Sequence, residues 1–410
     1  MQRPERRYTT IVIGGGPAGL FTAVNLQDYK SLLIEKGDKA GRKLLISGTG
    51  QCNFTHSGSM SDFLRHYGTN SRFLKHALHA FNNMDLIAFF KDAGIESIED
   101  KNGKIFPASL KAADILNTLL NACSDRNISF LRGCPVISVK HSGDTFRVYT
   151  SDSEFHCHNL VIATGGKSYP STGSTGDGYR FAEMLGHTIV EPKPALCAIT
   201  ISDYKMAALS GISIPSAGIS LFQNGVKTNE HHGDIVFTLK GLSGPGIIDF
   251  ARYMHDGDLL KINFTGISQQ VFVQEFVSCT QKSGKIPLQT WLKLFNVPKN
   301  LLRYIIDEAG GLPEQPMAEI QKKVRTRLSE LLCAYPFQIE KLSGYKSAMV
   351  TAGGVALNEI SSSTMESRLV RNLYFAGEVM DIDGDTGGYN IQAAFSTAYA
   401  AACAINSAGL

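Results

Sequence analysis

The feature that most constrains this chain is a short apolar strand that runs directly into glycines near the N-terminus. The strand Thr10-Ile11-Val12-Ile13 is followed by Gly14-Gly15-Gly16-Pro17-Ala18-Gly19. Gly14 permits a tight turn, Gly16 lets the backbone approach a pyrophosphate, and Gly19 lets the next helix pack close to the sheet. Glu35 ends the following apolar run, where its carboxylate can accept hydrogen bonds from ribose hydroxyls. The pattern predicts a bound dinucleotide; the alternative is a glycine-rich strand–helix turn without a ligand.

Length and charge limit the possible classes of protein. At 410 residues the chain exceeds what one hydrophobic core usually supports, so two or three domains are expected. A hydrophobic fraction of 43% and a charged fraction of 19% are typical of a globular protein. The formal net charge of +3 gives no support for a nucleic-acid footprint, although a local patch is compatible with it. We therefore expect no nucleic-acid partner. The partner that we expect is a small-molecule substrate, and the oligomeric state is left unassigned.

The eight cysteines are scattered, and none forms a Cys-x-x-Cys pair, so neither a zinc ribbon nor a dithiol motif is predicted. Single thiols suit a reducing cytoplasm. The apolar run at 11–13 is too short for a signal peptide, and no stretch approaches the length of a membrane span. We expect a cytoplasmic protein without a membrane partner. No metal is expected either, because the aspartates Asp381, Asp383 and Asp385 lack the closing glutamate of a calcium loop.

Short β segments and helices alternate through the first half of the chain. Hydrophobic periodicity predicts helices at 84–91 and 113–123, and strands at 128–131, 136–140, 145–149 and 154–158. A further, separate strand at 160–163 is continuously apolar and ends in Thr164-Gly165-Gly166. These three residues should therefore lie at the ligand-binding edge of a parallel sheet.

A domain boundary is expected near Pro192 and Pro194, because prolines at this spacing disfavour both a helix and a central strand. Residues from about 195 to 265 have a β pattern and those from about 268 to 335 a helical one. Lys322, Lys323, Arg325 and Arg327 lie beside the apolar stripe of the last predicted helix. A nucleic-acid patch is one interpretation of these cations, and a solvated helix face is the favoured one.

The C-terminal part returns to nucleotide-site chemistry. A strand at 371–376 leads into Gly377-Glu378, a glycine-rich loop follows at 383–390, and an Ala-rich helix is expected at 391–404. A flavin nucleotide needs such a second set of contacts, because its ribitol and ring extend beyond the pyrophosphate. Glu378 would accept hydrogen bonds from ribitol hydroxyls, and the helix starting near Asn390 would direct its N–H groups at the flavin. The predicted cofactor is therefore FAD; the alternative for Gly377-Glu378 is an ordinary strand-to-loop acid.

Several motifs together resemble the BaiN-like (YhiN-like) flavoproteins, which are related to the two-dinucleotide-binding-domain superfamily. The matching segments are Gly14 to Gly19, Gly41-Arg42-Lys43, Ser47-Gly48, Cys52-Asn53-Phe54-Thr55, Phe106-Pro107, Lys111-Ala112, Asp114, Ala163-Thr164-Gly165-Gly166, Ser168-Tyr169-Pro170, Thr172-Gly173, Thr175-Gly176-Asp177-Gly178-Tyr179, Phe237-Thr238, Gly241-Leu242-Ser243-Gly244-Pro245, Ala352-Gly353-Gly354-Val355, Gly377-Glu378 and Asp381 through Gln392.

This resemblance implies an α/β protein with a discontinuous Rossmann-like FAD-binding domain and an inserted small β-barrel plus helical subdomain. Our domain ranges are 1–192 for the first part of the FAD-binding domain, 193–265 for the barrel, 266–340 for the helical subdomain and 341–410 for the return to the barrel and the FAD-binding domain. The resemblance also implies NAD(P)H-linked reduction of conjugated C=C bonds, including those of oxo-bile-acid intermediates. Gln51 and Leu239 depart from the family pattern, in which Arg and His are common at these positions.

The predicted site has a cofactor-binding set and a catalytic set. The cofactor-binding residues are Gly14, Gly16, Pro17, Ala18, Gly19, Glu35, Lys36, Arg42, Lys43, Ser47, Gly48, Asn53, Val136, Thr164, Gly165, Gly166, Gly377, Glu378, Asp385, Gly388, Tyr389, Asn390 and Ile391.

The candidate catalytic residues are Lys43, Asn53 and Tyr169. Lys43 would stabilise anionic reduced flavin, or is a solvated loop lysine. Asn53 and Ser47 would bind the flavin carbonyl or N5 edges, or cap the loop. Tyr169 would donate a proton, or is a buried aromatic ring. Cys52 could be a redox thiol, although packing is the favoured role because no partner cysteine is near in sequence.

The mechanism that we predict is a ping-pong reductase with NADH or NADPH as a transient electron donor, because the chain carries one dinucleotide fingerprint and not two. Its acceptor would be an activated C=C bond between the FAD-binding domain and the insertion. The alternatives are an oxidase that passes its electrons to O₂, and a tRNA-modifying or non-catalytic flavoprotein. The substrate, the preferred nicotinamide and the proton donor are not predicted.

Overall fold

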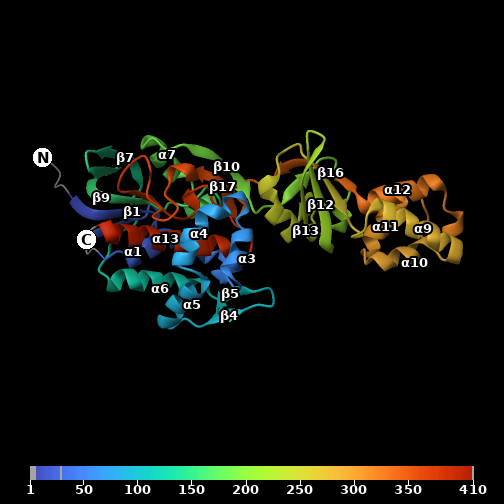
Figure 1. Cartoon of the computed structure of the whole chain (residues 1–410), viewed down its shortest axis with the longest axis horizontal. Helices are drawn as coiled ribbons and strands as arrows, with labels where there is room; N and C mark the ends of the chain where they lie inside the picture. Colours follow the sequence, from blue (N-terminus) through green and yellow to red (C-terminus); the bar gives the residue numbers. More distant parts are fainter. Residues whose placement is uncertain (1–5, 28–29, 409–410) are drawn as a thin grey trace. The chain divides into compact units, whose positions relative to one another are not determined.

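The structure is a computed structural model that describes residues 6–27 and 30–408. The chain forms two compact units (Figure 1). Unit 1 contains Met1–Ala195 and Tyr345–Leu410, and unit 2 contains Leu196–Gly344. Unit 1 is therefore discontinuous in sequence, whereas unit 2 is one continuous insertion.

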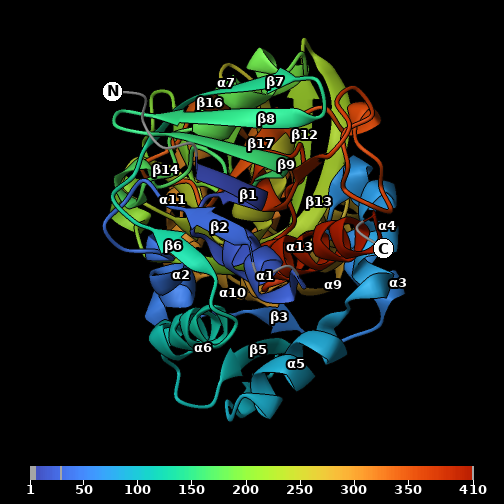
Figure 2. The same ribbon diagram turned by 90° about the vertical axis from the view of Figure 1, so that its left-hand side faces the viewer.

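Unit 1 is built on a seven-stranded sheet with the order β6-β2-β1-β9-β8-β7, to which β18 adds beside β9 (Figure 2). Strands β1, β2, β6, β9 and β18 are parallel where they pair, and β7 and β8 join antiparallel. The apolar parts of β1 and β9 are buried, as expected of parallel strands with both faces covered. The strands of this sheet are β1 (Arg6–Ile13), β2 (Ser31–Ile34), β6 (Ser129–Leu131), β7 (Val136–Ser142), β8 (Thr145–Thr150), β9 (Glu154–Ile162) and β18 (Leu373–Phe375).

Strand β9 corrects one expectation. The strands predicted separately at 154–158 and 160–163 form a single strand, Glu154–Ile162. Its first half pairs antiparallel with β8, its second half pairs with β18, and its whole length lies parallel to β1. The change of partner explains the change of pattern, because the second half is enclosed on both faces and reads as a continuous apolar run.

The C-terminal segment completes the N-terminal sheet. Leu373 of β18 pairs with Leu160, and helix α13 (Tyr389–Ala408) packs against α1 (Pro17–Asn25). Figure 2 shows these two helices side by side on one face of the sheet. Alanines on α13 allow the close approach, and Gly377 lies so near α1 that a Cβ there would come within 2.9 Å of the Ala18 methyl group. The two ends of unit 1 therefore share one core.

The remaining elements of unit 1 cover the sheet and support the loops. A three-stranded sheet has the order β3-β5-β4, and β10 pairs antiparallel with β17. The bounds are β3 (Thr55–His56), β4 (Ser97–Glu99), β5 (Lys104–Pro107), β10 (Ile189–Ala195), β17 (Val350–Val355), α2 (Arg42–Leu45), α3 (Met60–Arg65), α4 (Ser71–Ala80), α5 (Asn83–Asp92), α6 (Ala112–Asp125) and α7 (Asp177–Met184).

Unit 2 combines a closed barrel with a group of helices. The barrel order is β11-β14-β13-β12-β15-β16, and β16 closes it by pairing with β11. The bounds are β11 (Ile199–Ile201), β12 (Ser213–Gln223), β13 (Val226–Phe237), β14 (Gly241–Ser243), β15 (Leu259–Asn263), β16 (Tyr335–Leu342), α8 (Pro245–Ile248), α9 (Gln269–Ser283), α10 (Leu288–Leu292), α11 (Lys299–Glu308) and α12 (Lys322–Cys333). The range 266–340, assigned above to helices, thus ends inside a barrel strand.

An aromatic cluster holds the helices of unit 2 together. The Trp291 ring lies 5.2 Å from Phe272 and 5.1 Å from Phe276, edge-on in both cases. Aromatic pairs in this geometry contribute about 0.5–1.5 kcal/mol beyond the area they bury. The helices and the barrel share one continuous apolar core.

Candidate active site

The turn between β1 and α1 has the geometry that a pyrophosphate requires. Gly14 adopts a φ of +114° and donates its N–H to the Ile34 carbonyl at 2.8 Å. A Cβ on Gly19 would overlap the Gly14 carbonyl oxygen, so the helix can approach the turn only with glycine there. A Cβ on Gly16 would meet nothing within 4 Å, and no side chain caps α1. The N–H groups at the start of α1 therefore face open space, with the positive end of the helix dipole behind them.

The Glu35 carboxylate is held by two backbone N–H groups, one from the turn between β1 and α1 and one from the loop after β2. One carboxylate oxygen accepts the Gly15 N–H at 2.7 Å, and the other accepts the Gly37 N–H at 2.7 Å. These two bonds orient the carboxylate and leave lone pairs for further donors, since a carboxylate offers about four acceptor positions. The contact with a ribose stays a prediction, and the geometry is compatible with it.

Two cations tie this end of the site to the loop that follows β9. Lys36 Nζ lies 2.6 Å from Asp177 Oδ2 and also donates to the Thr175 hydroxyl. The Arg42 guanidinium donates to the Ser171 carbonyl at 2.7 Å. Lys36 and Arg42, both predicted to bind the cofactor, therefore connect loops that are distant in sequence.

The loop after β9 brings small residues next to the C-terminal motif. Gly165 has a φ of +72°, and a Cβ on Gly166 would come within 3.1 Å of Glu378 Oε1. The Thr164 hydroxyl is buried and has no hydrogen-bond partner. A buried hydroxyl without a partner needs an explanation, and a bound ligand is one.

Lys43 and Glu378 form an ion pair across the whole length of the sequence. Lys43 Nζ lies 2.7 and 3.0 Å from the two carboxylate oxygens, and their side chains are only 25% and 19% exposed. Glu378 Oε1 also accepts the Thr351 N–H at 2.8 Å. Lys43 is therefore ion-paired and mostly enclosed, and Glu378 is held by both Lys43 and the Thr351 N–H. The predicted contacts of both residues with flavin stay predictions.

The loop at 47–53 is held in an unusual backbone conformation. Thr49 and Cys52 are non-glycine residues with φ of 56° and 59°, a conformation that costs energy and is concentrated at ligand sites. Asn53 Oδ1 is buried without a partner, and a Cβ on Gly388 would approach it to 2.8 Å. The loop and the start of α13 therefore meet at a second orphaned polar atom.

Asn390 stabilises the glycine-rich loop at 383–390 through side-chain hydrogen bonds. Its side-chain oxygen accepts the Gly384 N–H at 2.7 Å, and its amide nitrogen donates to the Gly384 carbonyl at 2.8 Å. Asp385 Oδ2 lies 2.8 Å from His66 Nδ1, and the Asp385 N–H donates to the His66 carbonyl at 2.9 Å. The predicted residues Asp385 and Asn390 thus shape the loop through contacts with protein groups.

Two histidines beside this loop were missed by the sequence analysis. The Tyr389 ring is stacked between His66, at 4.1 Å, and His56, at 5.1 Å. His56 ends strand β3 and His66 directly follows helix α3. No local pattern distinguishes either histidine from a surface residue. The available signal was Asp385, a carboxylate in a family motif with no partner assigned.

The other predicted residues occupy varied positions. The Ser47 hydroxyl donates to the Leu44 carbonyl at 2.7 Å, as a loop-capping group does. Tyr169 adopts a φ of 53° and donates its N–H to the Tyr345 carbonyl at 2.9 Å. Val136 is buried at the start of β7, and Ile391 is half-buried in α13. None of these contacts tests the predicted roles.

Cys52 and the two departures from the family pattern lie in contrasting surroundings. Burial raises the pKa of the Cys52 thiol to about 12, which keeps it protonated and disfavours a role as a reactive thiolate. Gln51 is exposed, and Leu239 is 71% exposed in unit 2. Among the described residues, no cluster of three or more His, Cys, Asp or Glu side chains could hold a metal ion, and no helix could span a membrane.

The residues of unit 1 fit FAD. The uncapped start of α1 and the open space at Gly16 suit a pyrophosphate, and Glu35 suits an adenosine ribose. The orphaned atoms of Thr164 and Asn53 supply hydrogen-bonding groups that no protein group satisfies. A Rossmann-like sheet with this set of groups defines the class of protein, an FAD-dependent oxidoreductase.

Comparisons with known proteins agree with this class. The chain belongs to the family described as HI0933-like protein Rossmann domain, whose model matches residues 8–404. It is 33% identical over 402 residues to a ribosomal RNA dihydrouridine synthase of Escherichia coli (strain K12), covering 97% of each chain. It is 27% identical over 400 residues to a 3-dehydro-bile acid delta(4,6)-reductase of Clostridium scindens (strain ATCC 35704 / DSM 5676 / VPI 13733 / 19), covering 95% of this chain and 97% of the relative.

A solved structure supports the fold. The 3-ketosteroid-delta4-(5alpha)-dehydrogenase from Rhodococcus jostii RHA1 aligns with a TM-score of 0.52 and 12% identity, covering 100% of this chain and 98% of that one. The expected family, Rossmann-like fold, FAD cofactor and oxidoreductase class are confirmed.

Proposed function

We propose that this protein reduces the C5=C6 bond of a uridine in ribosomal RNA to give dihydrouridine, with NADH or NADPH as the electron donor. The observation that carries the proposal is the similarity to the E. coli protein of that name, which is 33% identical over nearly the full length of both chains. The bile-acid reductase is a more distant relative at 27% identity. This proposal departs from our expectation of a small-molecule substrate and no nucleic-acid partner. The expectation of no nucleic-acid partner rested on net charge, and that of a small-molecule substrate rested on the family resemblance.

Both relatives' names describe the addition of hydrogen to an unsaturated carbon skeleton, so one site chemistry suits both. In uracil the C5=C6 bond is conjugated with the C4 carbonyl. A hydride added at C6 places negative charge on C5 and the C4 oxygen, and a proton must then reach C5. The protein has to hold the ring, stabilise that charge and supply the proton.

The residues of unit 1 have distinct roles in this proposal. When bound and reduced, FAD supplies a hydride from its N5 atom. Glu35 and the start of α1 hold the adenosine and the pyrophosphate. Lys43, fixed by Glu378, provides a positioned cation, and Asn53 provides an amide whose oxygen has no protein donor.

Two side chains are candidates for the proton donor. Tyr169 is the one predicted from the sequence. His66 is added by the structure, because Asp385 and the Tyr389 ring fix the orientation of its imidazole. A histidine held by a carboxylate in this way is a common general acid.

The test is a reaction of the FAD-loaded protein with ribosomal RNA that lacks dihydrouridine, under anaerobic conditions. Either NADH or NADPH should bleach the flavin, and the RNA should restore its colour. Mass spectrometry of RNA fragments should then find one uridine heavier by two hydrogen atoms. Unmodified RNA after flavin bleaching would contradict the proposal, and flavin reoxidation by a 3-oxo-steroid dienone in the same preparation would favour a small-molecule reductase.

A further inference from the structure

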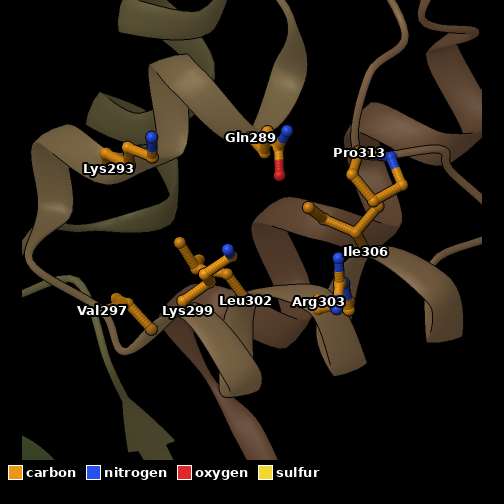
Figure 3. Close-up of a pocket in the computed structure, with 8 residues that line it drawn as sticks. All are labelled: Gln289, Lys293, Val297, Lys299, Leu302, Arg303, Ile306 and Pro313. Atoms are coloured by element: carbon orange, nitrogen blue, oxygen red, sulfur yellow. The ribbon is translucent and has the colours of Figure 1, made fainter.

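The helices of unit 2 enclose a hollow that no role described so far uses. It lies between α10 and helix α11, with a cavity volume of about 50 Å³ (Figure 3). Its lining residues are Gln289, Lys293, Val297, Lys299, Leu302, Arg303, Ile306 and Pro313.

The rim of the hollow is positively charged. Lys293, Lys299 and Arg303 are all exposed, and no carboxylate is among the lining residues. In the part of the chain that the structure describes, none of the three forms a salt bridge. Figure 3 shows Lys293 on one side of the hollow and the two α11 cations on the other. Three cations without acidic partners around one concave surface create a positive potential that favours an anion.

The start of α11 adds to the same potential. The helix begins at Lys299 after Pro298, has ten residues, and carries no side-chain cap. Its first N–H groups are therefore available to an anion, and the helix dipole favours negative charge there. Since Lys299 also lines the hollow, the helix end and the rim cations act on one region.

The floor of the hollow is apolar. Val297, Leu302 and Ile306 are buried, and Pro313 lies opposite them. A free inorganic anion gains nothing from such a floor. A nucleotide in an RNA chain presents both kinds of group, a phosphate for the rim and a flat base or ribose for the floor.

Residues 268–333 have a net positive charge, to which the four cations of α12 contribute as well as those around the hollow. Residues 268–333 contain nine Lys or Arg and six Asp or Glu, which leaves 31 of each among the other residues of the chain. No acidic residue occurs between Glu275 and Asp307, a stretch with five cations. A single-signed segment on a neutral protein is the pattern of a nucleic-acid contact.

We propose that this hollow binds a phosphate and its nucleoside in the backbone of the RNA substrate, so that unit 2 contributes to RNA recognition. The inference rests on the proposed function, since it takes RNA as the substrate. It concerns binding alone, and it assigns the contact to the hollow and not to the neighbouring cations of α12.

The experiment compares two matched double variants of the full-length, FAD-loaded protein. K293Q/K299Q removes two cations from the hollow, and K322Q/K323Q removes two exposed cations from the start of α12. Binding to a ribosomal RNA transcript is measured at several KCl concentrations. K293Q/K299Q should weaken binding about tenfold and lower the slope of log K against log [KCl] by about two, because each lost phosphate contact lowers it by about one. K322Q/K323Q should change affinity by less than about twofold.

Equal affinity of K293Q/K299Q and the wild type, or an equal loss in both variants, would overturn the inference. Dihydrouridine formation in the same RNA separates this result from the proposed function. RNA binding that depends on Lys293 and Lys299 without any product would keep the inference and refute the proposed function. Product formed by K293Q/K299Q at the wild-type rate and affinity would refute the inference alone.

Discussion

The site of unit 1 and the hollow of unit 2 are built in opposite ways. The first is shaped by backbone, with glycines that admit no side chain, and its charged groups are neutralised by one another, as in the Lys43–Glu378 pair. The second is shaped by side chains on helices, and its cations have no acidic partners among the described residues. Under the proposals above, the first surface would hold a cofactor that stays bound, and the second would hold a polyanion that binds and dissociates.

This difference explains why the site of unit 1 can be predicted from the sequence, whereas the hollow of unit 2 cannot. A backbone site needs particular residues at fixed spacing, since only glycine accepts the positive φ at Gly14 or the close packing at Gly19. An electrostatic surface needs only enough cations on one face. Lys293, Lys299 and Arg303 have no spacing that would separate them from solvated residues.

The largest expected effect concerns the backbone site. In Gly19→Ala the new methyl group would overlap the Gly14 carbonyl oxygen, and α1 would have to move away from the sheet. We expect a loss of unfolding free energy of about 3 kcal/mol or more, at the upper end of overpacking effects, with loss of FAD. Circular dichroism melting and flavin absorbance measure the two effects. A yellow protein with wild-type melting temperature would show that the backbone tolerates a side chain here.

Gly16→Ala should separate cofactor binding from stability within the same motif. The added Cβ meets nothing within 4 Å, and Gly16 has a negative φ, so unfolding free energy should change by less than about 1 kcal/mol. The methyl group would occupy the space assigned to the pyrophosphate. FAD affinity should fall by about tenfold or more, or ~1.4 kcal/mol. Isothermal titration of the apoprotein with FAD gives the affinity, and unchanged affinity would remove the pyrophosphate from this position.

Removing a paired cation should cost more than removing an unpaired one. Lys43→Met leaves the Glu378 carboxylate mostly enclosed without its counter-charge, and should lower the unfolding free energy by about 1 kcal/mol, between exposed and buried pairs. Lys299→Gln, from the hollow, should change it by less than about 0.5 kcal/mol. Urea denaturation measures both. Adding Glu378→Gln to Lys43→Met should recover part of the lost unfolding free energy. Equal effects of Lys43→Met and Lys299→Gln would show that the paired and unpaired cations do not differ.

The smallest effect is a pH dependence confined to unit 1. Burial lowers the pKa of His187, and this outweighs the opposing influence of Glu359, 3.1 Å away. The unfolded chain therefore binds a proton that the native protein resists, so stability is present above the ordinary histidine pKa of about 6.5 and declines as pH falls below it. Melting temperatures between pH 7.5 and 5.5 should show this decline. His187→Phe should flatten that part of the curve, and an unchanged slope would assign the decline to other groups.

Much of the cofactor half could be predicted from the sequence. The β1–α1 turn, Glu35, the loop after β9 and the return of the chain at Gly377-Glu378 all follow from residues whose backbone geometry is restrictive. The partner of Lys43 could not be predicted, because Glu378 is 335 positions away and an ion pair leaves no periodic trace. His66 was missed for the same reason.

Strand β9 shows a second limit of pattern reading. Its two halves differ in hydrophobicity because their neighbours differ, and the sequence shows only the difference. β-Propensity is a property of single residues, whereas the neighbouring strands with which a strand pairs are set by the tertiary fold.

The pairing of β18 with β9 has a consequence for biosynthesis. Residues 196–344 are translated as one uninterrupted block, while the main sheet of unit 1 lacks strand β18 until residue 375 has been translated. Because domains fold as units during synthesis, unit 2 can fold on the nascent chain before unit 1 is complete. The predicted FAD site would then be complete only at the end of translation, and we expect a premature stop codon before Tyr389 to yield a colourless polypeptide with an intact barrel.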